Sequence, residues 1–154
     1  AQFGRDINLL KISLNKNFQF GKFNLENYLV YQKTDFESVL RTPEFYTYNS
    51  FYYSSRWFTV LTVNLGFDVW YNTAYTAPAY AINVGQFYND NAAVKFDSYP
   101  VVDVWIKATL KRTNLFLKYD YANQGLFSKG FYTVNRYPMQ DALLKLGVRW
   151  NFYN

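Results

Sequence analysis

The sequence contains neither cysteine nor histidine among its 154 residues. The lack of cysteine excludes disulfide frameworks and thiol nucleophiles, and without either residue no Cys/His zinc site can form. The lack of histidine removes the base of the Ser-His-Asp triad, so the serines and aspartates of the chain build no familiar lipase site. We therefore expect no enzymatic activity, and no catalytic, cofactor or metal site.

Long apolar runs are also missing. No segment approaches the roughly 18 to 20 consecutive apolar residues of a membrane-spanning helix, which excludes a helical membrane protein. Charged residues make up only 18% of the chain, while aromatic residues make up 23% and hydrophobic residues 50%. This composition excludes disorder. The length fits one domain over residues 1–154, without a separate soluble domain.

Clusters of positive charge are lacking as well, although the net charge is +5. The longest basic run is Lys111-Arg112, and most other cations stand singly between apolar residues. Nucleic-acid binding requires clustered basic side chains that contact phosphates. We therefore expect no nucleic-acid partner and interpret the cations as lining a solvated or channel face.

What the sequence does contain is seven segments in which apolar and polar side chains alternate, as they do along β-strands. They are residues 6–18, 23–33, 46–58, 60–72, 100–112, 115–122 and 142–153. Most are far longer than strands of soluble proteins, which average about five to six residues. One side of each segment is apolar and the other mostly polar, with Trp70, Trp105 and Phe116 as exceptions on the polar side.

The connections between these segments alternate between short and long. Tight turns are expected at 19–22, 58–59 and 112–114, and long loops at 34–45, 73–99 and 123–141. Tight turns at one end and long loops at the other are typical of outer-membrane barrels. Aliphatic strand centres flanked by Tyr, Trp and Phe also fit an apolar band with aromatic girdles.

The sequence therefore predicts an all-β protein, an antiparallel transmembrane β-barrel in the outer membrane of a Gram-negative bacterium. Outer-membrane lipid is the partner expected for its apolar faces. The long segment 73–99 is expected to fold into the lumen or over its mouth. The alternative is a soluble barrel of the lipocalin kind, whose aliphatic faces point inward. Dependence on detergent distinguishes the two.

The C-terminal strand carries a separate pattern. Lys145, Gly147, Trp150 and Phe152 form a polar-x-Gly-x-x-aromatic-x-aromatic sequence close to the chain end. This pattern looks like the terminal-strand signal that the barrel-assembly machinery recognises. A glycine there would let a partner edge approach, and the two aromatic rings would sit at the lipid interface. The competing interpretation is that any amphipathic terminal strand can end in aromatic residues.

Several short motifs carry a family resemblance. They are Tyr99-Pro100-Val101-Val102-Asp103, Leu115-Phe116-Leu117-Lys118-Tyr119, Asn123-Gln124-Gly125-Leu126, Tyr137-Pro138-Met139-Gln140-Asp141 and Leu146-Gly147-Val148-Arg149-Trp150-Asn151-Phe152. With these motifs, the sequence from about Lys11 to the end resembles the C-terminal part of the putative β-barrel porins of Bacteroidetes. Members of that family are considerably longer, so the resemblance implies the terminal piece of a larger barrel. It supplies no catalytic residue and no ligand.

The strand count points in the same direction. Bacterial single-chain barrels have an even number of strands, and seven strands leave two open edges. Each unpaired backbone group in hydrocarbon costs several kcal/mol, so an open sheet is unstable in a membrane. We expect the missing strands to come from the same parent chain, from another envelope protein, or from an unrecognised strand within 73–99.

The leading functional hypothesis is a passive outer-membrane channel for small polar solutes, with the polar face lining water. The candidate lumen-lining residues are Lys11, Glu26, Arg56, Asp68, Asp103, Lys107, Lys111, Lys118, Asp120, Lys145 and Arg149. Seven of these are cationic and four anionic, which predicts a weak preference for anions in an open pore. Alternatively, Asp103 with Lys118 and Lys107 with Asp120 pair across strands as a structural ladder.

A second functional hypothesis comes from a different class. The terminal pattern and the odd strand count also fit a partial barrel that is a substrate or subunit of the barrel-assembly machinery or of another envelope complex. In that case the open edges would be filled by a partner protein.

Overall fold

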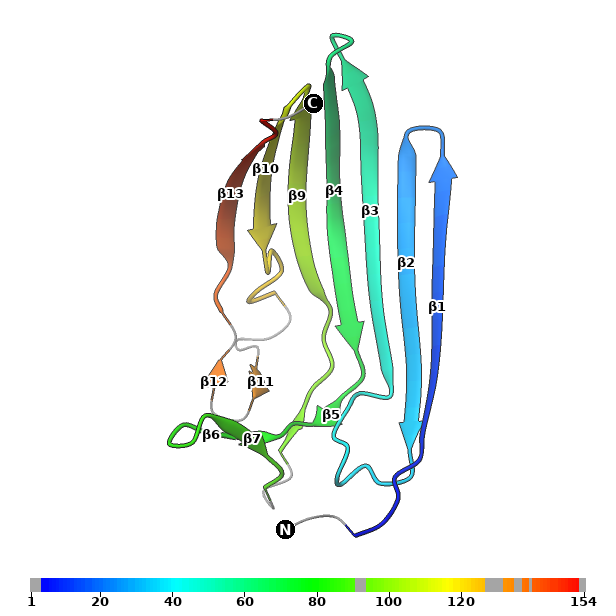
Figure 1. Cartoon of the computed structure of the whole chain (residues 1–154), viewed down its shortest axis with the longest axis vertical. Helices are drawn as coiled ribbons and strands as arrows, with labels where there is room; N and C mark the ends of the chain where they lie inside the picture. Colours follow the sequence, from blue (N-terminus) through cyan, green and yellow to red (C-terminus); the bar gives the residue numbers. More distant parts are fainter. Residues whose placement is uncertain (1–3, 91–93, 127–131, 135–136, 139, 153–154) are drawn as a thin grey trace.

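The computed structural model describes residues 4–90, 94–126, 132–134, 137–138 and 140–152, and it contains one large antiparallel sheet (Figure 1). The sheet has seven strands in the order β1-β2-β3-β4-β9-β10-β13. Their bounds are Leu9–Phe20 for β1, Phe23–Thr34 for β2, Phe45–Trp57 for β3, Leu61–Asn72 for β4, Val101–Leu110 for β9, Thr113–Asp120 for β10 and Leu143–Trp150 for β13. The described part of the chain has no helix that is long and apolar enough to cross a membrane.

The seven long strands predicted from the alternation are confirmed, with small shifts at their ends. The first strand runs to Phe20 rather than to residue 18, because Phe20 pairs with Phe23 around the turn Gly21-Lys22. Gly21 has a φ of 61°, a conformation that glycine adopts without strain in two-residue hairpins. The last strand ends at Trp150, and residue 153 of the predicted segment lies outside the described residues.

The alternation of tight turns and long loops is also confirmed. The hairpins β1-β2, β3-β4 and β9-β10 turn at one end of the sheet, the upper end in Figure 1, and the long loops lie at the other end. The loops contain short strands, namely β5 (Tyr75–Thr76), β6 (Ala79–Ala81), β7 (Gln86–Tyr88), β8 (Lys95–Phe96), β11 (Tyr132–Val134) and β12 (Tyr137–Pro138). Of the two predicted loops that hold them, residues 91–93, 127–131, 135–136 and 139 lie outside the described residues.

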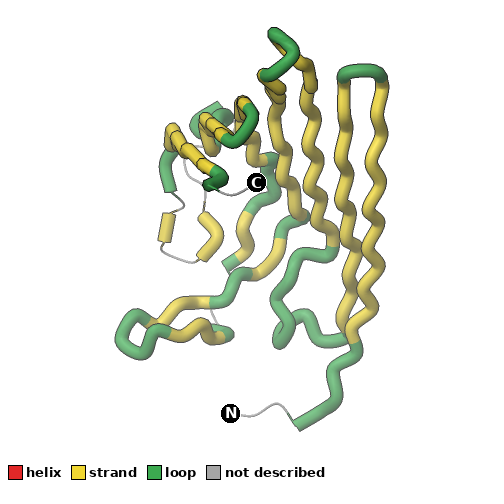
Figure 2. Tube along the Cα trace, turned by 45° about the horizontal axis from the view of Figure 1, so that its top comes forward, coloured by secondary structure: helices red, strands yellow, loops and turns green. Residues whose placement is uncertain are grey.

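The large sheet is curved but does not close. Figure 2 shows β9, β10 and β13 turning out of the plane of β1 and β2, yet β1 and β13 pair with only one neighbour each. Segment 73–99 does not supply the missing strand, because its described strands pair among themselves as β5 with β8 and β6 with β7. The described sheet thus has the two open edges that seven strands predict, and both edges keep unpaired backbone groups.

One face of the sheet, here called the apolar face, is covered by no second layer of described residues. The strand register places Leu65 opposite Ile106, Ile106 opposite Leu117 and Leu117 opposite Leu146, so these side chains share that face. Leu65 is 52% exposed and Leu146 78% exposed. A soluble monomer rarely exposes so extended an apolar surface. Only Val30, Val63, Ala77 and Ala79 are buried hydrophobic residues within the described chain.

The apolar face carries a row of polar side chains on the β1 side. Lys16, Asn27 and Asn49 are aligned in register across β1, β2 and β3 on this face. The Asn27 side chain donates a hydrogen bond to the Lys16 carbonyl oxygen at 3.1 Å, and the Asn49 side chain donates to Thr47 Oγ1 at 2.8 Å. The apolar character is therefore strongest over β4, β9, β10 and β13.

On the opposite, polar face, a glycine and a tryptophan pack together. Gly66 on β4 lies in register between Tyr52 on β3 and Trp105 on β9, and the two rings meet with their centroids 5.6 Å apart. A Cβ at Gly66 would lie 2.5 Å from the Cβ of Tyr52. The absence of a side chain at Gly66 lets the two rings close over the strand between them.

Candidate functional site

On the polar face, the sign of the charged side chains changes with their position along the strands, from the hairpin turns to the loops. The row nearest the hairpin turns aligns Arg56, Thr62, Thr109, Asn114 and Arg149 across five strands. The next row toward the loops contains Lys107, which lies opposite Asn64 and Phe116. We call these two rows the basic rows, since their ionisable side chains are all cationic.

Farther toward the loops lies an acidic row. The register places Glu26 opposite Ser50, Ser50 opposite Asp68, and Asp68 opposite Asp103. Like charges on neighbouring strands repel, so a row of this kind requires compensating partners. Within the described residues, no group of three or more acidic side chains is arranged to hold a metal ion.

Asp68 and Glu26 obtain their partners from neutral donors. The Ser50 hydroxyl donates to Asp68 Oδ1 at 2.7 Å and Trp105 Nε1 donates to the same oxygen at 2.8 Å. The Tyr52 hydroxyl donates to Glu26 Oε1 at 3.0 Å. Asp68 is buried. These bonds explain why Trp105 departs from the polar pattern, since its ring covers Gly66 and its N–H satisfies a buried carboxylate.

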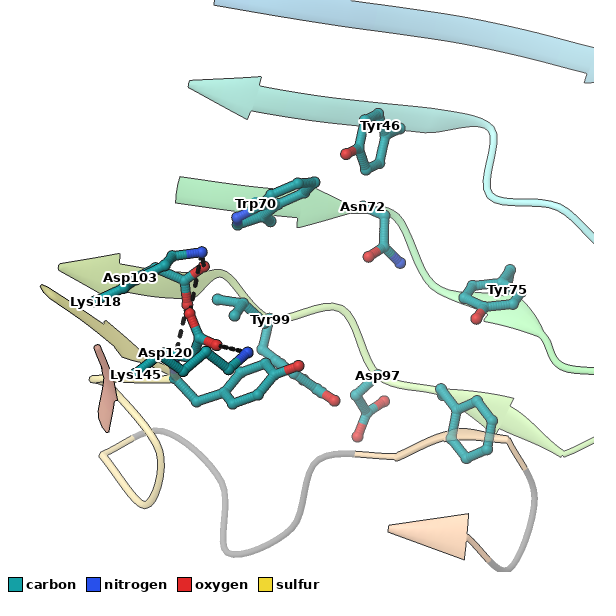
Figure 3. A pocket seen from close by; sticks show the side chains of 13 residues that line it. Tyr46, Trp70, Asn72, Tyr75, Asp97, Tyr99, Asp103, Lys118, Asp120 and Lys145 are labelled. Atoms are coloured by element: carbon teal, nitrogen blue, oxygen red, sulfur yellow. Dashed lines mark hydrogen bonds and ion pairs between the residues drawn. The ribbon is translucent and has the colours of Figure 1, made fainter. Parts of the chain in front are cut away.

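The other end of the acidic row is neutralised by lysines in an ion-pair ladder (Figure 3). Lys118 Nζ lies 2.8 Å from Asp103 Oδ2 and 3.0 Å from Asp120 Oδ1, and Lys145 pairs with the second oxygen of Asp120. The Tyr121 backbone N–H donates to Asp103 Oδ1 at 2.9 Å. Both carboxylate side chains are 7% exposed, whereas Lys118 is 30% and Lys145 47% exposed.

The ladder corrects one of the two pairings expected from the sequence. Lys118 does pair with Asp103, but the expected pair of Lys107 with Asp120 is wrong. The register explains the difference, because Lys107 lies opposite Phe116, which is four residues before Asp120 on β10. Four residues along a strand correspond to about 13 Å, beyond the reach of an ion pair.

The two remaining lumen candidates are Lys11 and Lys111, and only Lys11 lies on a strand. Lys11, on the exposed edge strand β1, lies on the polar face opposite Gln32. Lys111, in contrast, does not lie on a strand. It belongs to the β9-β10 turn and has a φ of 46°, so the prediction that a strand runs through residue 112 is wrong at this end.

The terminal-strand residues also divide between the two faces. Lys145 and Gly147 are on the polar face, whereas Trp150 is on the apolar face, opposite Thr113. Gly147 does not face an open edge, because the Phe116 ring of β10 lies over it and a Cβ there would overlap two ring atoms. This packing explains why Phe116 interrupts the polar pattern.

A pocket of about 430 Å³ lies at the loop end of the polar face (Figure 3). Its aromatic lining residues are Tyr46, Trp70, Tyr75, Phe96, Tyr99 and Tyr121. Its charged lining residues are the four members of the ion-pair ladder and Asp97. Burial raises the pKa of the Tyr75 hydroxyl on the short strand β5. The sequence pattern identified Trp70 as exceptional but gave no indication that rings from the loops line a pocket with it.

Hydrogen bonds and an ion pair connect the loop between β2 and β3 to segment 73–99 near this end. Arg41 Nη1 lies 3.1 Å from Asp90 Oδ1 and donates to the Ala77 carbonyl oxygen at 3.1 Å. Asn89 Nδ2 donates to the Val39 carbonyl oxygen at 2.9 Å. Segment 73–99 is therefore held at the loop end, where Tyr75 and Tyr99 contribute to the pocket wall.

Comparison with known proteins places this geometry in context. A family model described as "Putative porin" matches residues 1–154. Neither the search of curated proteins nor that of solved structures finds a match. The match spans the described sheet, the loops and the pocket, and it agrees with the resemblance carried by the short motifs. The bacterial group that the resemblance implies stays a prediction.

Proposed function

Because the chain belongs to the putative porin family, we propose that it forms part of a passive channel for small polar solutes in the outer membrane of a Gram-negative bacterium. The observation that carries this proposal is the separation of the two faces of the sheet. Aliphatic side chains such as Leu65 and Leu146 are uncovered on one face, and the charged rows occupy the other. Lipid would contact the first face and water the second.

We also propose that further strands complete the barrel. The backbone groups along β1 and β13 are unpaired on their outer sides, and in hydrocarbon such groups cost several kcal/mol each. Strands of the same parent chain or of another envelope protein would satisfy them. The polar face would then enclose water.

Planar-bilayer recordings test the channel proposal. Replacing Lys107 by Glu should shift the reversal potential in a salt gradient toward cation preference, since lumen charges act over about 8 Å at physiological salt. Lys33→Glu is the matched control, because Lys33 lies at the loop end of β2 in register with Leu10 of the apolar face. The absence of conductance from the complete parent barrel, or equal shifts in both variants, would contradict the proposal.

A second candidate function is favoured by the open edges of the sheet together with the terminal pattern. The chain would then be a partial barrel handled by the barrel-assembly machinery or held in another envelope complex. Under this candidate, Trp150→Ala with Phe152→Ala should lower the yield of folded, heat-modifiable protein in a pulse-chase experiment. Ile12→Ala on the edge strand β1 is the control that should leave assembly kinetics unchanged. Unaltered kinetics in the double variant would remove this candidate.

A further inference from the structure

The pocket at the loop end combines two kinds of surface that few solutes can use together. Six of its lining residues are aromatic, and most of the others carry hydrogen-bond donors or acceptors. Trp70 and Tyr46 come from the strands β4 and β3, so these rings are fixed by the sheet. The Trp70 ring also packs against Tyr48, with centroids 4.5 Å apart.

The four members of the ion-pair ladder offer hydrogen bonds to the pocket but no net charge. Asp103 and Asp120 are balanced by Lys118 and Lys145 in the ion-pair ladder. An ammonium group has three donors, and because Lys118 is engaged by two carboxylates and Lys145 by one, donors remain on both. The side chains of the two lysines are far more exposed than those of the aspartates, so the remaining donors are the accessible part of the ladder.

An acceptor stands on the loop side of the same pocket. Asp97 lines it from the segment after β8, is exposed, and has no ion-pair partner within the described residues. In Figure 3 its carboxylate lies near Tyr99 and apart from the ladder. The pocket therefore has donors at one end, an acceptor at the other, and ring faces along its walls.

We propose that this pocket is a binding site for the ring of an uncharged saccharide, entered from the polar face. A pyranose has a face of C–H bonds that packs on aromatic rings, and equatorial hydroxyls that both donate and accept. A volume of about 430 Å³ falls within the range of small-molecule sites, which is about 300 to 1,000 Å³. The proposal rests on the channel function above, for which it names a class of solute.

Charged ligands would make fewer favourable contacts in the pocket than a neutral ligand. A small organic cation would gain from the rings and from Asp97, but it would meet the exposed ammonium groups of Lys118 and Lys145. An anion would meet those ammonium groups only beside the buried carboxylates that already neutralise them. A neutral ligand avoids both penalties and still uses the donors, the acceptor and the rings.

Titration calorimetry on the detergent-solubilised full chain tests this site without requiring conductance. Maltose is the probe, sorbitol tests hydroxyls without a rigid ring face, and tetramethylammonium tests the cation alternative. We expect maltose to bind and sorbitol to give no measurable heat. Trp70→Leu should weaken maltose binding by about tenfold or more, which corresponds to the loss of one stacked ring. Trp57→Leu, at the hairpin end of the apolar face, is the matched control and should leave binding unchanged.

Asp97→Asn provides a second variant, on an exposed residue of the pocket. The amide oxygen still accepts a hydrogen bond, so maltose binding should change by less than about threefold, whereas a cation should lose about tenfold. Absence of maltose binding, equal binding in Trp70→Leu, or tighter binding of tetramethylammonium than of maltose would overturn the proposal. A chain that binds maltose but never conducts would refute the channel and leave the site standing.

Discussion

At the residue scale, aromatic rings from neighbouring strands pack over two glycines. Gly66 lies beneath the contact of Tyr52 with Trp105, and Gly147 lies beneath Phe116. In both cases a Cβ would lie closer to the neighbour than real atoms approach. The glycines are therefore needed for packing within the sheet, which is a different reason from the approach of a partner edge expected for Gly147.

Gly147→Ala tests this packing directly. The new methyl group would overlap the Phe116 ring, and overpacking of this kind costs about 1 to 3 kcal/mol in the free energy of unfolding. Phe116→Ala removes the ring and should restore most of that loss in the double variant. Urea unfolding of the refolded protein measures the three free energies, and strictly additive losses would show that the two residues do not interact.

At the element scale, the long strands were predictable and the short ones were not. Period-two alternation over ten or more residues identifies β4 and β9 from sequence alone. Strands of two or three residues such as β5 and β8 have no detectable period, so the loop structure and the pocket rings that it contributes could not be foreseen.

The acidic row shows a second limit of the sequence. Glu26, Asp68 and Asp103 lie on three strands, and only the register reveals that they share one height. The same knowledge was needed to exclude the pairing of Lys107 with Asp120. The sequence pattern also did not distinguish the row of polar side chains at Lys16 and Asn27 from the rest of the apolar face.

The two faces of a strand should differ in their tolerance of charge. Leu65→Arg places a cation on the apolar face near the centre of β4 and should cost about 2 to 4 kcal/mol if that face meets the bilayer midplane. Thr62→Lys, three residues earlier on the polar face, should cost much less. Unfolding of both variants in lipid vesicles measures the difference, and equal losses would mean that the assignment of faces is wrong.

At the scale of the whole molecule, the polar face is layered from the turns to the loops. The basic rows with Arg56, Lys107 and Arg149 come first, the acidic row follows, and the aromatic pocket lies at the loop end. The seven cations and four anions among the lumen candidates are therefore not mixed evenly over the polar face. A solute crossing this face would meet rings, then carboxylates with their lysines, then isolated cations.

The central claim is that the apolar face contacts lipid and the polar face contacts water. The chain has no native cysteine, so single cysteines can be placed at successive positions of β4 and labelled with a water-soluble maleimide in liposomes. Thr62→Cys and Asn64→Cys should be labelled, whereas Val63→Cys and Leu65→Cys should be protected. Protection at Leu65 is the most telling, because no part of the described chain covers that side chain and only lipid can shield it. Uniform labelling, or labelling at Leu65 with protection at Asn64, would contradict the account.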